Sequence, residues 1–252
     1  MIRIPVLGAT GNLAFPPVER AFAEPDGLLA VGGDLSPDRL LEAYRHGIFP
    51  WFSDGQPILW WSPSLRTVFD TARMHVPRRL ARWLRRCDWS IRADTAFVEV
   101  MRACATTRRR GHGTWITGDM LAAYARLHDL GHAHSIEVRD ANGQLAGGIY
   151  GVALGRMFYG ESMFSHRSDA SKIALAALVC FCRVNGIDLI DCQQRTSHLA
   201  SLGAREIARS AFERLITPRV RGPALTDWTY HRSHWERLRD AAPALPTEEV
   251  AP

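Results

Sequence analysis

The chain has 252 residues, of which 46% are hydrophobic and 23% are charged. This composition excludes a chain that is disordered throughout, because it supplies enough apolar side chain for a core in one large domain or two unequal ones. The formal net charge is +5, and no apolar run approaches the roughly 20 residues of a membrane-spanning helix, so we expect no membrane segment.

Residues 1–63 are rich in Gly, Pro and Trp and predict a small N-terminal α/β domain. Leu28 to Val31 reads as a short apolar strand, followed by a Gly-Gly turn. A helix then begins after Ser36, a good N-cap residue with proline behind it, and ends before Gly47. The aromatic residues of "IFPWF" and "PILWWSP" either form the core of this domain or lie at its surface, where a ring can stack on a base.

Residues 64–238 predict a second, α+β domain. A helix over 94–104 and another closed by Gly131 precede a run of strands that begins at "HSIEV". An Asn-Gly pair at 142–143 predicts the turn between the first two strands, and "ALGR" predicts another. The helix "SKIALAALVCFCRV" then leads to the strand "LIDCQ". A meander, a helix and a further strand, in this order, are typical of a GCN5-related acyltransferase (GNAT-like) core, although the order alone does not establish a function.

Nine arginines gather in two short segments, 73–86 and 106–112. A helix in the first segment would place Arg78, Arg82 and Arg85 on one face. Such clusters form either a solvated charged surface or a phosphate-binding surface whose affinity depends strongly on salt. The final residues, "AAPALPTEEVAP", read as a disordered tail over 239–252.

Cysteines and histidines give no pattern of metal binding. The five cysteines are Cys87, Cys104, Cys180, Cys182 and Cys192. An odd number with no CxxC pair is typical of free thiols in a reducing compartment, so we expect a cytoplasmic protein without a signal peptide. His128, His132 and His134 straddle a helix end and a strand, and we expect them to be structural, with no metal site.

Several long motifs together go further than the order of elements. They are "EPDGLLAVGGDLSPDRLLEAYRHGIFPWF", "PILWWSP", "TWIT", "AYARLHDLGHAHSIEV", "GGIYGVALG", "GESMFS" and "LIDCQ…HLASLGAREI". From about residue 13 to about residue 216 the chain closely resembles the leucyl/phenylalanyl-tRNA–protein transferases. The resemblance implies a small N-terminal domain followed by a GNAT-like domain.

The same resemblance implies an activity and its partners. Leu or Phe would move from Leu-tRNA or Phe-tRNA to the N-terminal amine of a protein that begins with Arg or Lys, which marks that protein for N-degron proteolysis. Arg78, Arg82 and Arg85 would then contact the tRNA backbone, and we expect a monomer. Acetyl-CoA transferases of the wider superfamily carry a Gly-rich pyrophosphate loop where this chain has "SHRSDASK". We therefore expect no CoA and no other cofactor.

The strand "LIDCQ" carries the residues closest to the chemistry. Alternate side chains of a strand share a face, so Asp191 and Gln193 point the same way and Cys192 points the other way, which predicts a buried, inert thiol. The resemblance implies that Asp191 and Gln193 are the catalytic pair. Gln193 would orient the attacking amine or donate to the ester oxygen, and Asp191 would fix the Gln193 amide and stabilise positive charge on the nitrogen. Asp191 as a carboxylate that only stabilises a turn is the structural alternative. The proton passes to the leaving oxygen through either a protein base or a ribose hydroxyl.

Five further residues are candidates for substrate binding. Glu161, in "GESMF", offers a negative charge to the acceptor's Arg or Lys, or else pairs with one of the many arginines. The resemblance associates Trp51 and Trp115 with the terminal adenosine, on which an aromatic ring can stack. Phe158 and Met163 would shape the Leu/Phe pocket, the alternative being an ordinary place in the core.

Two other functions fit parts of the sequence. A thiol hydrolase would use Cys192 and His198, but no basic neighbour lies beside Cys192 to lower its pKa. A non-catalytic RNA-binding module would use the arginine clusters, but it leaves the Asp-x-Gln strand end unexplained. Transfer of label from Leu-tRNA to a protein with N-terminal Arg separates all three.

Overall fold

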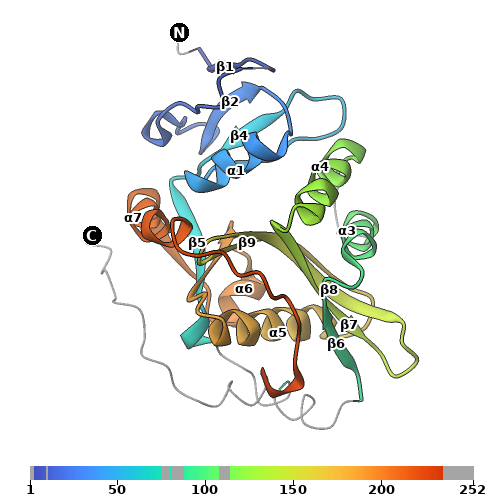
Figure 1. The fold of residues 1–252 in the computed structure, drawn as a ribbon. Helices are drawn as coiled ribbons and strands as arrows, with labels where there is room; N and C mark the ends of the chain where they lie inside the picture. Colours follow the sequence, from blue (N-terminus) through green and yellow to red (C-terminus); the bar gives the residue numbers. More distant parts are fainter. Residues whose placement is uncertain (1–2, 10, 75–79, 81–87, 108–113, 235–252) are drawn as a thin grey trace.

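The computed structural model describes residues 3–9, 11–74, 80, 88–107 and 114–234. Within them the chain forms a small N-terminal sheet and a large sheet with helices on both faces (Figure 1). The predictions for Arg78, Arg82 and Arg85 and for the tail at 239–252 lie outside the described residues.

The small sheet has the strand order β1-β2-β4-β3. Its strands are β1 (Val6–Leu7), β2 (Leu28–Gly32), β3 (Phe49–Pro50) and β4 (Leu59–Trp61), with a short 3-10 turn, η1, at Val18–Arg20. Helix α1 (Pro37–Arg45) crosses between β2 and β3, and its N-cap Ser36 accepts a hydrogen bond from the Arg39 N–H, as the sequence predicts. Trp60 of β4 is fully buried.

The large sheet has the order β11-β5-β10-β9-β8-β7-β6. Its strands are β5 (Leu65–Asp70), β6 (Ser90–Ala93), β7 (Ala133–Arg139), β8 (Leu145–Leu154), β9 (Met157–Ser165), β10 (Leu189–Gln193) and β11 (Arg205–Ala208). Neighbouring strands are antiparallel, apart from the parallel pair β9 and β10. The predicted turns at Asn142-Gly143 and at "ALGR" join β7 to β8 and β8 to β9, with Gly143 and Gly155 at positive φ.

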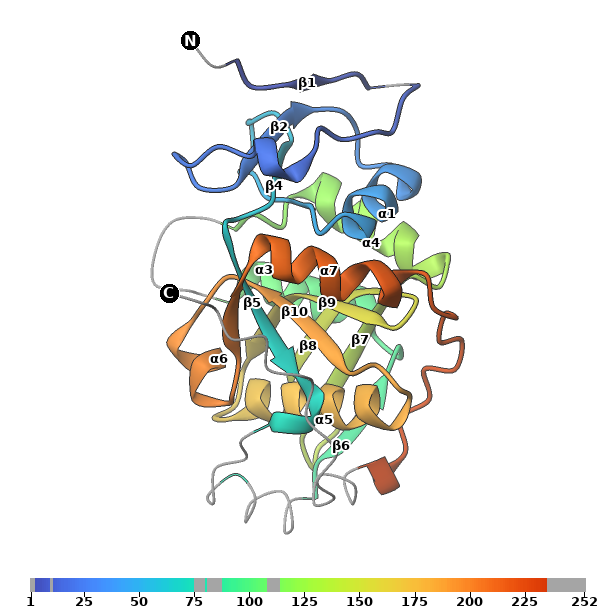
Figure 2. The same cartoon turned by 90° about the vertical axis from the view of Figure 1, so that its left-hand side faces the viewer.

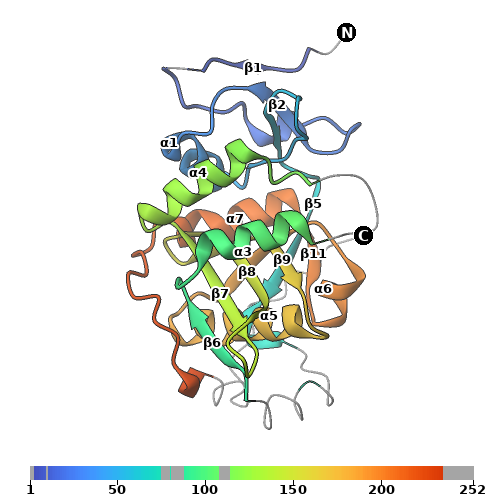
Figure 3. The same ribbon diagram turned by 90° about the vertical axis from the view of Figure 1, so that its right-hand side faces the viewer.

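Helices cover both faces of this sheet (Figures 2 and 3). They are η2 (Thr71–Arg73), α3 (Phe97–Thr106), α4 (Gly118–Asp129), α5 (Ala170–Val184), α6 (Ser197–Ser201) and α7 (Arg209–Val220). The apolar α5 packs on one face, where it forms a core with Phe69, Ile149 and Ile190. On the other face, α3, α4 and α7 share a core that continues into α1 and the small sheet. The predicted mixed α/β architecture, with an N-terminal region and a sheet-containing C-terminal part, is confirmed.

The parallel strands β9 and β10 separate after Tyr159 and Asp191, towards their C-terminal ends. The two strands pair over Met157–Tyr159 and Leu189–Asp191, while β9 itself continues to Ser165. Both strands are irregular at this point. In β9, Glu161 is an extra residue between Gly160 and Ser162, which pair with Gly151 and Tyr150 of β8. β10 shifts register against β5 between Asp191 and Gln193. Bulges add local twist and bend a strand, so they help to part the two strands.

No described helix has the length and the apolar character that a bilayer-spanning segment needs.

Candidate active site

A cavity of about 570 Å³ lies where β9 and β10 separate. Both strands line it, β9 from Gly160 to Ser165 and β10 through Ile190, Cys192 and Gln193. Its apolar wall includes Trp51, Trp115, Ile149, Met163, Leu175 and Leu199. A cavity of this size, mainly apolar and edged by a few polar groups, is typical of a small-molecule or substrate site.

The carboxylate of Asp191 is fully buried and is held by Arg66 of β5. Arg66 Nε and Nη2 donate to the two carboxylate oxygens at 2.8 and 2.5 Å, which makes a two-point ion pair. Charge-assisted pairs of this kind fix the orientation of both groups. Asp191 is not among the residues that line the cavity. Its carboxylate contacts Arg66 and the Gln193 N–H instead.

Arg66 also links the N-terminal part of the chain to β10. Its Nη1 donates to the carbonyl oxygen of Gly47 at 2.9 Å, just after α1. Its guanidinium lies between the rings of Phe49 and Phe212, 4.7 and 4.8 Å from their centres. A guanidinium stacked and bonded on every side cannot be replaced by lysine without loss of geometry.

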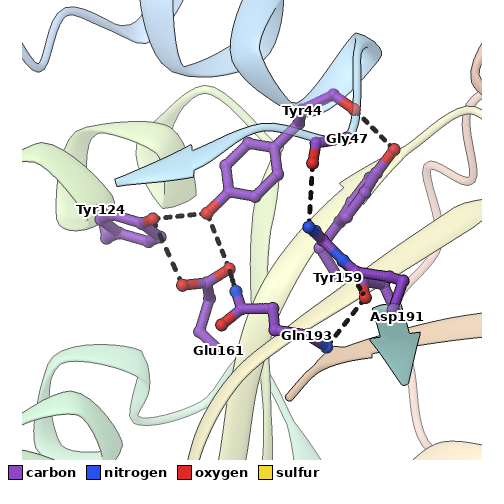
Figure 4. Close-up of polar contacts among 8 residues, drawn as sticks. Tyr44, Gly47, Tyr124, Tyr159, Glu161, Asp191 and Gln193 are labelled. Carbon is purple, nitrogen blue, oxygen red and sulfur yellow. Dashed lines mark hydrogen bonds and ion pairs between the residues drawn. The ribbon is translucent and has the colours of Figure 1, made fainter. Parts of the chain in front are cut away.

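Gln193 takes an unusual backbone conformation at the end of β10. Its φ is 59°, in the left-handed region that non-glycine residues rarely occupy. Its N–H donates to Asp191 Oδ1 at 2.8 Å, so the carboxylate that pairs with Arg66 also holds this turn. The carboxamide Nε2 then donates to Glu161 Oε1 at 3.0 Å, across the opening from β9 (Figure 4). Such local strain is retained where the surroundings over-determine it, and it is common at functional sites.

Glu161 accepts hydrogen bonds from two tyrosines as well as from Gln193. Tyr44 of α1 donates to Oε1 at 2.7 Å and Tyr124 of α4 to Oε2 at 3.4 Å, while the two phenol oxygens lie 2.5 Å apart (Figure 4). Burial raises the pKa of Glu161 to about 7, against the lowering effect of the Tyr44 hydrogen bond. Burial and the charge of Glu161 raise the pKa of Tyr44 well above its usual range, so this phenol remains a donor.

The other predicted substrate residues divide into those at the cavity and one that is elsewhere. Trp51, Trp115 and Met163 line the cavity together with Glu161. Trp51 is 43% exposed, and its ring and that of Trp61 make an edge-to-face contact at 5.7 Å. Phe158 is not among the lining residues; it is 1% exposed in the α5 core.

Phe158 packs against the α5 core, as Met163 does, but it lies where β9 is still paired with β10, opposite Ile190. It lies before the Glu161 bulge and its ring is 5.8 Å from that of Trp228, whereas Met163 lies after the bulge and reaches the cavity. The structure therefore does not bring Phe158 to the pocket that the sequence analysis expected it to shape.

Cys192 corrects a sequence expectation. Its side chain does leave β10 on the face opposite Asp191, but it lines the cavity and is partly exposed. The expectation of a thiol buried away from the site fails because the parted strands let the cavity reach the α5 face, which Ile190 and Leu175 also line. Burial raises the pKa of the Cys192 thiol, with the Asp191 charge acting in the same direction. A thiol in this state is a poor nucleophile.

Sequence reasoning missed Arg66, Tyr44 and Tyr124, which bind the predicted residues from distant parts of the chain. Arg66 carried a signal: an arginine at the head of the apolar strand "LRTVFD" must find a partner if it is buried. The two tyrosines gave none, because buried tyrosines are common on helices. Away from this cavity, the described residues bring Asp94, His128 and His134 together as possible metal ligands.

Similar proteins identify the class and then the family. The curated proteins that match most of the chain are aminoacyltransferases. Residues 68–217 match the family model described as leucyl/phenylalanyl-tRNA protein transferase, and residues 33–64 match that of its N-terminal domain. The chain belongs to this family.

Three relatives named leucyl/phenylalanyl-tRNA–protein transferase show how close the likeness is. The protein of Chromobacterium violaceum is 55% identical over 92% of this chain and 98% of its own length. That of Methylibium petroleiphilum is 57% identical over 87% and 84% of the two chains, and that of Xanthomonas campestris pv. campestris is 58% identical over 83% and 84%. Among solved structures, FemX aligns at a TM-score of 0.44 with 11% identity over 72% of this chain and 71% of its own, too weak a likeness to support a conclusion.

Proposed function

We propose that the protein transfers Leu or Phe from aminoacyl-tRNA to the N-terminal α-amine of proteins that begin with Arg or Lys, and so marks them for N-degron proteolysis. The amine nitrogen attacks the ester carbonyl carbon, a peptide bond forms, and the ribose 3′-oxygen leaves and takes up a proton. The observation that carries the proposal is the Gln193 carboxamide, fixed beside an apolar cavity by a strained backbone and by Glu161.

The fold supports acyl transfer of the GNAT type. In the sheet, the parallel strands β9 and β10 part at the cavity, with a bulge on each strand. An acyl donor that enters between such strands meets the polar groups at their ends. CoA fits poorly as that donor, because the segment before α5 has no glycine and places Asp169 at the helix N-cap. That carboxylate is paired with Lys172 but offers no donor to a pyrophosphate, for which a helix N-terminus is otherwise suited.

The cavity offers separate places for the parts of aminoacyl-tRNA. The Leu or Phe side chain would enter the apolar part formed by Ile149, Met163 and Leu175. The terminal adenine would stack on Trp51 and Trp115, with about 1–3 kcal/mol for each stacked base. Phe158 does not line this space and is not part of the proposal.

Asp191 and Gln193 have different tasks in this proposal. Gln193 accepts from or donates to the reacting groups, and an amide is too weak a base to remove a proton. The amine needs little help, because an α-amine has a pKa of about 7.7–8.0 and a useful fraction is neutral. Asp191 holds the Gln193 backbone through its N–H, so it acts as a positioning residue, and the gain in rate comes from proximity and electrostatics.

Glu161 is the proposed partner of the acceptor. It lines the cavity, bonds to Gln193 and belongs to no ion pair among the described residues. Its pKa of about 7 leaves the carboxyl poised between its two forms, and a guanidinium or ammonium brought close would favour the carboxylate. Selection of Arg or Lys at the acceptor's N-terminus follows from this contact.

The tRNA body would be bound by Arg78, Arg82 and Arg85, which lie outside the described residues. Neutralising all three should raise KM for aminoacyl-tRNA and flatten its salt dependence, and should leave KM for an aminoacyl-adenosine donor nearly unchanged, because that donor lacks the distal phosphates. Equal loss with both donors would argue against a role in tRNA binding. We further propose that the protein acts in the cytoplasm as a monomer; the four described cysteines are all free thiols, as expected in a reducing compartment.

The decisive experiment uses labelled Leu-tRNA and a peptide with N-terminal Arg, with a matched peptide that begins with Gln. Label in the Arg peptide, absent with a Gln193→Ala variant, supports transfer. Free labelled leucine without labelled peptide would indicate the Cys192/His198 hydrolase instead. Binding of tRNA with neither product would indicate an RNA-binding module and overturn the proposal.

A further inference from the structure

A second cluster of reactive side chains lies at the other end of α4. Asp94 follows β6, His128 lies in the last turn of α4, and His134 lies in β7. One potential ligand atom from each falls within 4.8 Å of the other two. None of the three lines the substrate cavity, so the cluster is not explained by the proposed transfer.

Main-chain carbonyls account for one nitrogen of each imidazole. His128 Nδ1 lies 2.8 Å from the Ala133 oxygen, and His134 Nε2 lies 3.2 Å from the Gly131 oxygen. A carbonyl oxygen only accepts, so these two nitrogens carry the protons. His128 Nε2 and His134 Nδ1, of which the second faces Asp94, are then the atoms that a metal would take, and a carbonyl behind each imidazole is the usual outer support of a metal-binding histidine.

The three groups are held in place before any ion arrives. The ring of His128 stacks on Phe97 at 4.4 Å, and that of His134 stacks on Trp228 at 3.7 Å, each nearly parallel. Asp94 Oδ1 accepts from the Ser135 N–H at 2.8 Å. Ligands fixed in this way lose little freedom on binding an ion.

A neighbouring cavity gives access and room for water. It has a volume of about 570 Å³ and is lined by Asp94, His128 and His134 as well as by Asp227 and Arg92. Asp94 and His128 are partly exposed to it, and His134 is buried. Asp227 adds negative charge at the rim, while Arg92 opposes it, so binding depends on the ligands themselves more than on the field of the cavity.

We propose that Asp94, His128 and His134 form a zinc-binding site. Two imidazoles and one carboxylate, with water in the fourth position, are a ligand set that zinc commonly takes. The His134 Nδ1 to Asp94 Oδ2 distance of 2.7 Å is that of a hydrogen bond, so one proton lies between them without the ion. Zinc takes the place of this proton, which passes to solvent. The bound ion would tie β6, α4 and β7 together beside Trp228 and would stabilise the fold without entering the transfer reaction.

The test uses untagged, full-length protein that has been stripped with a chelator, and titrates Zn²⁺ alone by calorimetry. We expect saturable binding of one ion per chain. Asp94→Asn and His128→Gln should each weaken it by at least about tenfold. His132→Gln is the matched control: it removes a histidine from the same turn that is absent from the cluster, and it should bind as the wild type does. Circular dichroism verifies that each variant is folded.

A second measurement serves if a substitution disturbs folding. Zn²⁺ should raise the Tm of the wild-type chain and of His132→Gln, because a ligand that binds the native state stabilises it, and should not raise that of Asp94→Asn. Absence of saturable binding to the wild type overturns the proposal. So does zinc binding that is equal in the wild type, Asp94→Asn and His128→Gln, since the ion would then be bound elsewhere.

Discussion

The two carboxylates near the point where β9 and β10 separate, Glu161 and Asp191, differ in what surrounds them. Asp191 is fully buried, is paired with a guanidinium and does not reach the cavity. Glu161 lines the cavity and is held by neutral groups, two phenols and an amide. A carboxylate with a permanent cation is suited to hold structure, whereas one held by neutral donors remains free to pair with a cation that a substrate brings.

Gln193 connects these two regions. Its backbone is bonded to the Asp191 side and its side chain to the Glu161 side. The Arg66–Asp191 pair, here called the fixed pair, thus holds the backbone of Gln193. From it the carboxamide reaches Glu161, which the two tyrosines also contact; this group is here called the adaptable region (Figure 4). On this division, substitutions at Arg66 and Asp191 should change the free energy of unfolding and the position of Gln193. Substitutions at Glu161 should change the pH dependence of stability and the choice of acceptor.

The largest effect is expected when the fixed pair is broken. Arg66→Met leaves Asp191 charged and unpaired in the interior, which typically costs about 3–5 kcal/mol of unfolding free energy. Urea denaturation measures this loss. Arg139→Met is the control, because its ion pair with Glu99 is at the surface and such pairs contribute about 1 kcal/mol or less.

A double variant separates stability from position. Arg66→Met with Asp191→Leu removes both charges, so most of the stability should return, while transfer should stay low because the Gln193 N–H has lost its acceptor. Full recovery of transfer in the double variant would show that the pair matters to the fold alone. A loss no larger than that of Arg139→Met would contradict the buried ion pair itself.

Next in size is the loss of the connecting carboxamide. Gln193→Ala should lower kcat by about 100- to 1000-fold, the range seen when one preorganised hydrogen-bonding group is removed from an active site. The Kd for aminoacyl-tRNA should change little, because in the proposed reaction the carboxamide acts on the reacting atoms. Single-turnover kinetics give both quantities. Gln194→Ala, one residue further along the cavity lining, should cost much less; equal losses would deny Gln193 a special role.

How much of this site the sequence predicts depends on the range of the interaction. Local signals were sufficient for α1, with its Ser36 cap, and for the turn at Asn142-Gly143. The helix predicted over 94–104 is found at Phe97–Thr106, since Asp94 takes a positive φ and cannot open it. Such boundaries depend on a few backbone angles that composition does not specify.

Local sequence signals did not predict the register shifts and the long-range contacts of the site. Period-2 alternation assumes a regular strand: it places Cys192 opposite Asp191 correctly, but it does not predict the register shifts at Glu161 and Gln193. Arg66 reaches Asp191 across 125 positions of sequence, and Tyr44 reaches Glu161 across 117. Pairing of strands and packing of α1 create these contacts, so the motifs predicted the residues proposed for the reaction but not the groups that hold them.

Glu161, in the adaptable region, should make the free energy of unfolding depend on pH. The pKa of Glu161 is about 7 in the folded protein, above its ordinary 4.5. A raised pKa means that the protonated carboxyl stabilises the fold fully below about pH 4.5, and that this contribution is lost as pH rises through about 7. Glu161→Gln lacks this contribution. The free energy of unfolding of the wild type should therefore fall by up to about 3 kcal/mol relative to that of the variant as pH rises from about 4.5 to about 7.

Urea denaturation of both proteins at closely spaced pH values makes the measurement. Glu99→Gln, which removes a surface carboxylate, serves as the matched change and should give a small difference from the wild type. A wild-type-minus-Glu161→Gln difference that stays constant from pH 4.5 to 8 would show that Glu161 does not titrate in this window.

A smaller effect is expected on acceptor choice. A charged contact between Glu161 and the acceptor's cation is worth on the order of 1.5–3 kcal/mol. Glu161→Gln should therefore weaken the preference for Arg over Met at the acceptor N-terminus by roughly 10- to 100-fold, with KM for the donor nearly constant. Values of kcat/KM for peptides that begin with Arg, Lys, Met and Gln measure it. An unchanged Arg-to-Met ratio would assign the cation to another group, such as the Trp115 ring.

The smallest effect is expected at Cys192, although it lies between the two residues proposed for the reaction and lines the cavity. Its thiol has a raised pKa because of burial, and only the thiolate is a useful nucleophile. His198, the other half of a hypothetical thiol pair, also lines the cavity, but its Nε2 is buried without a hydrogen-bond partner among the described residues. Cys192→Ala removes a single sulfur from the wall and should change kcat/KM for transfer by less than about threefold, or about 0.6 kcal/mol. The same assay on Gln193→Ala gives the scale for comparison. Loss of transfer in a folded Cys192→Ala protein, together with loss of any release of free leucine, would reverse the assignment and make the thiol the reacting group.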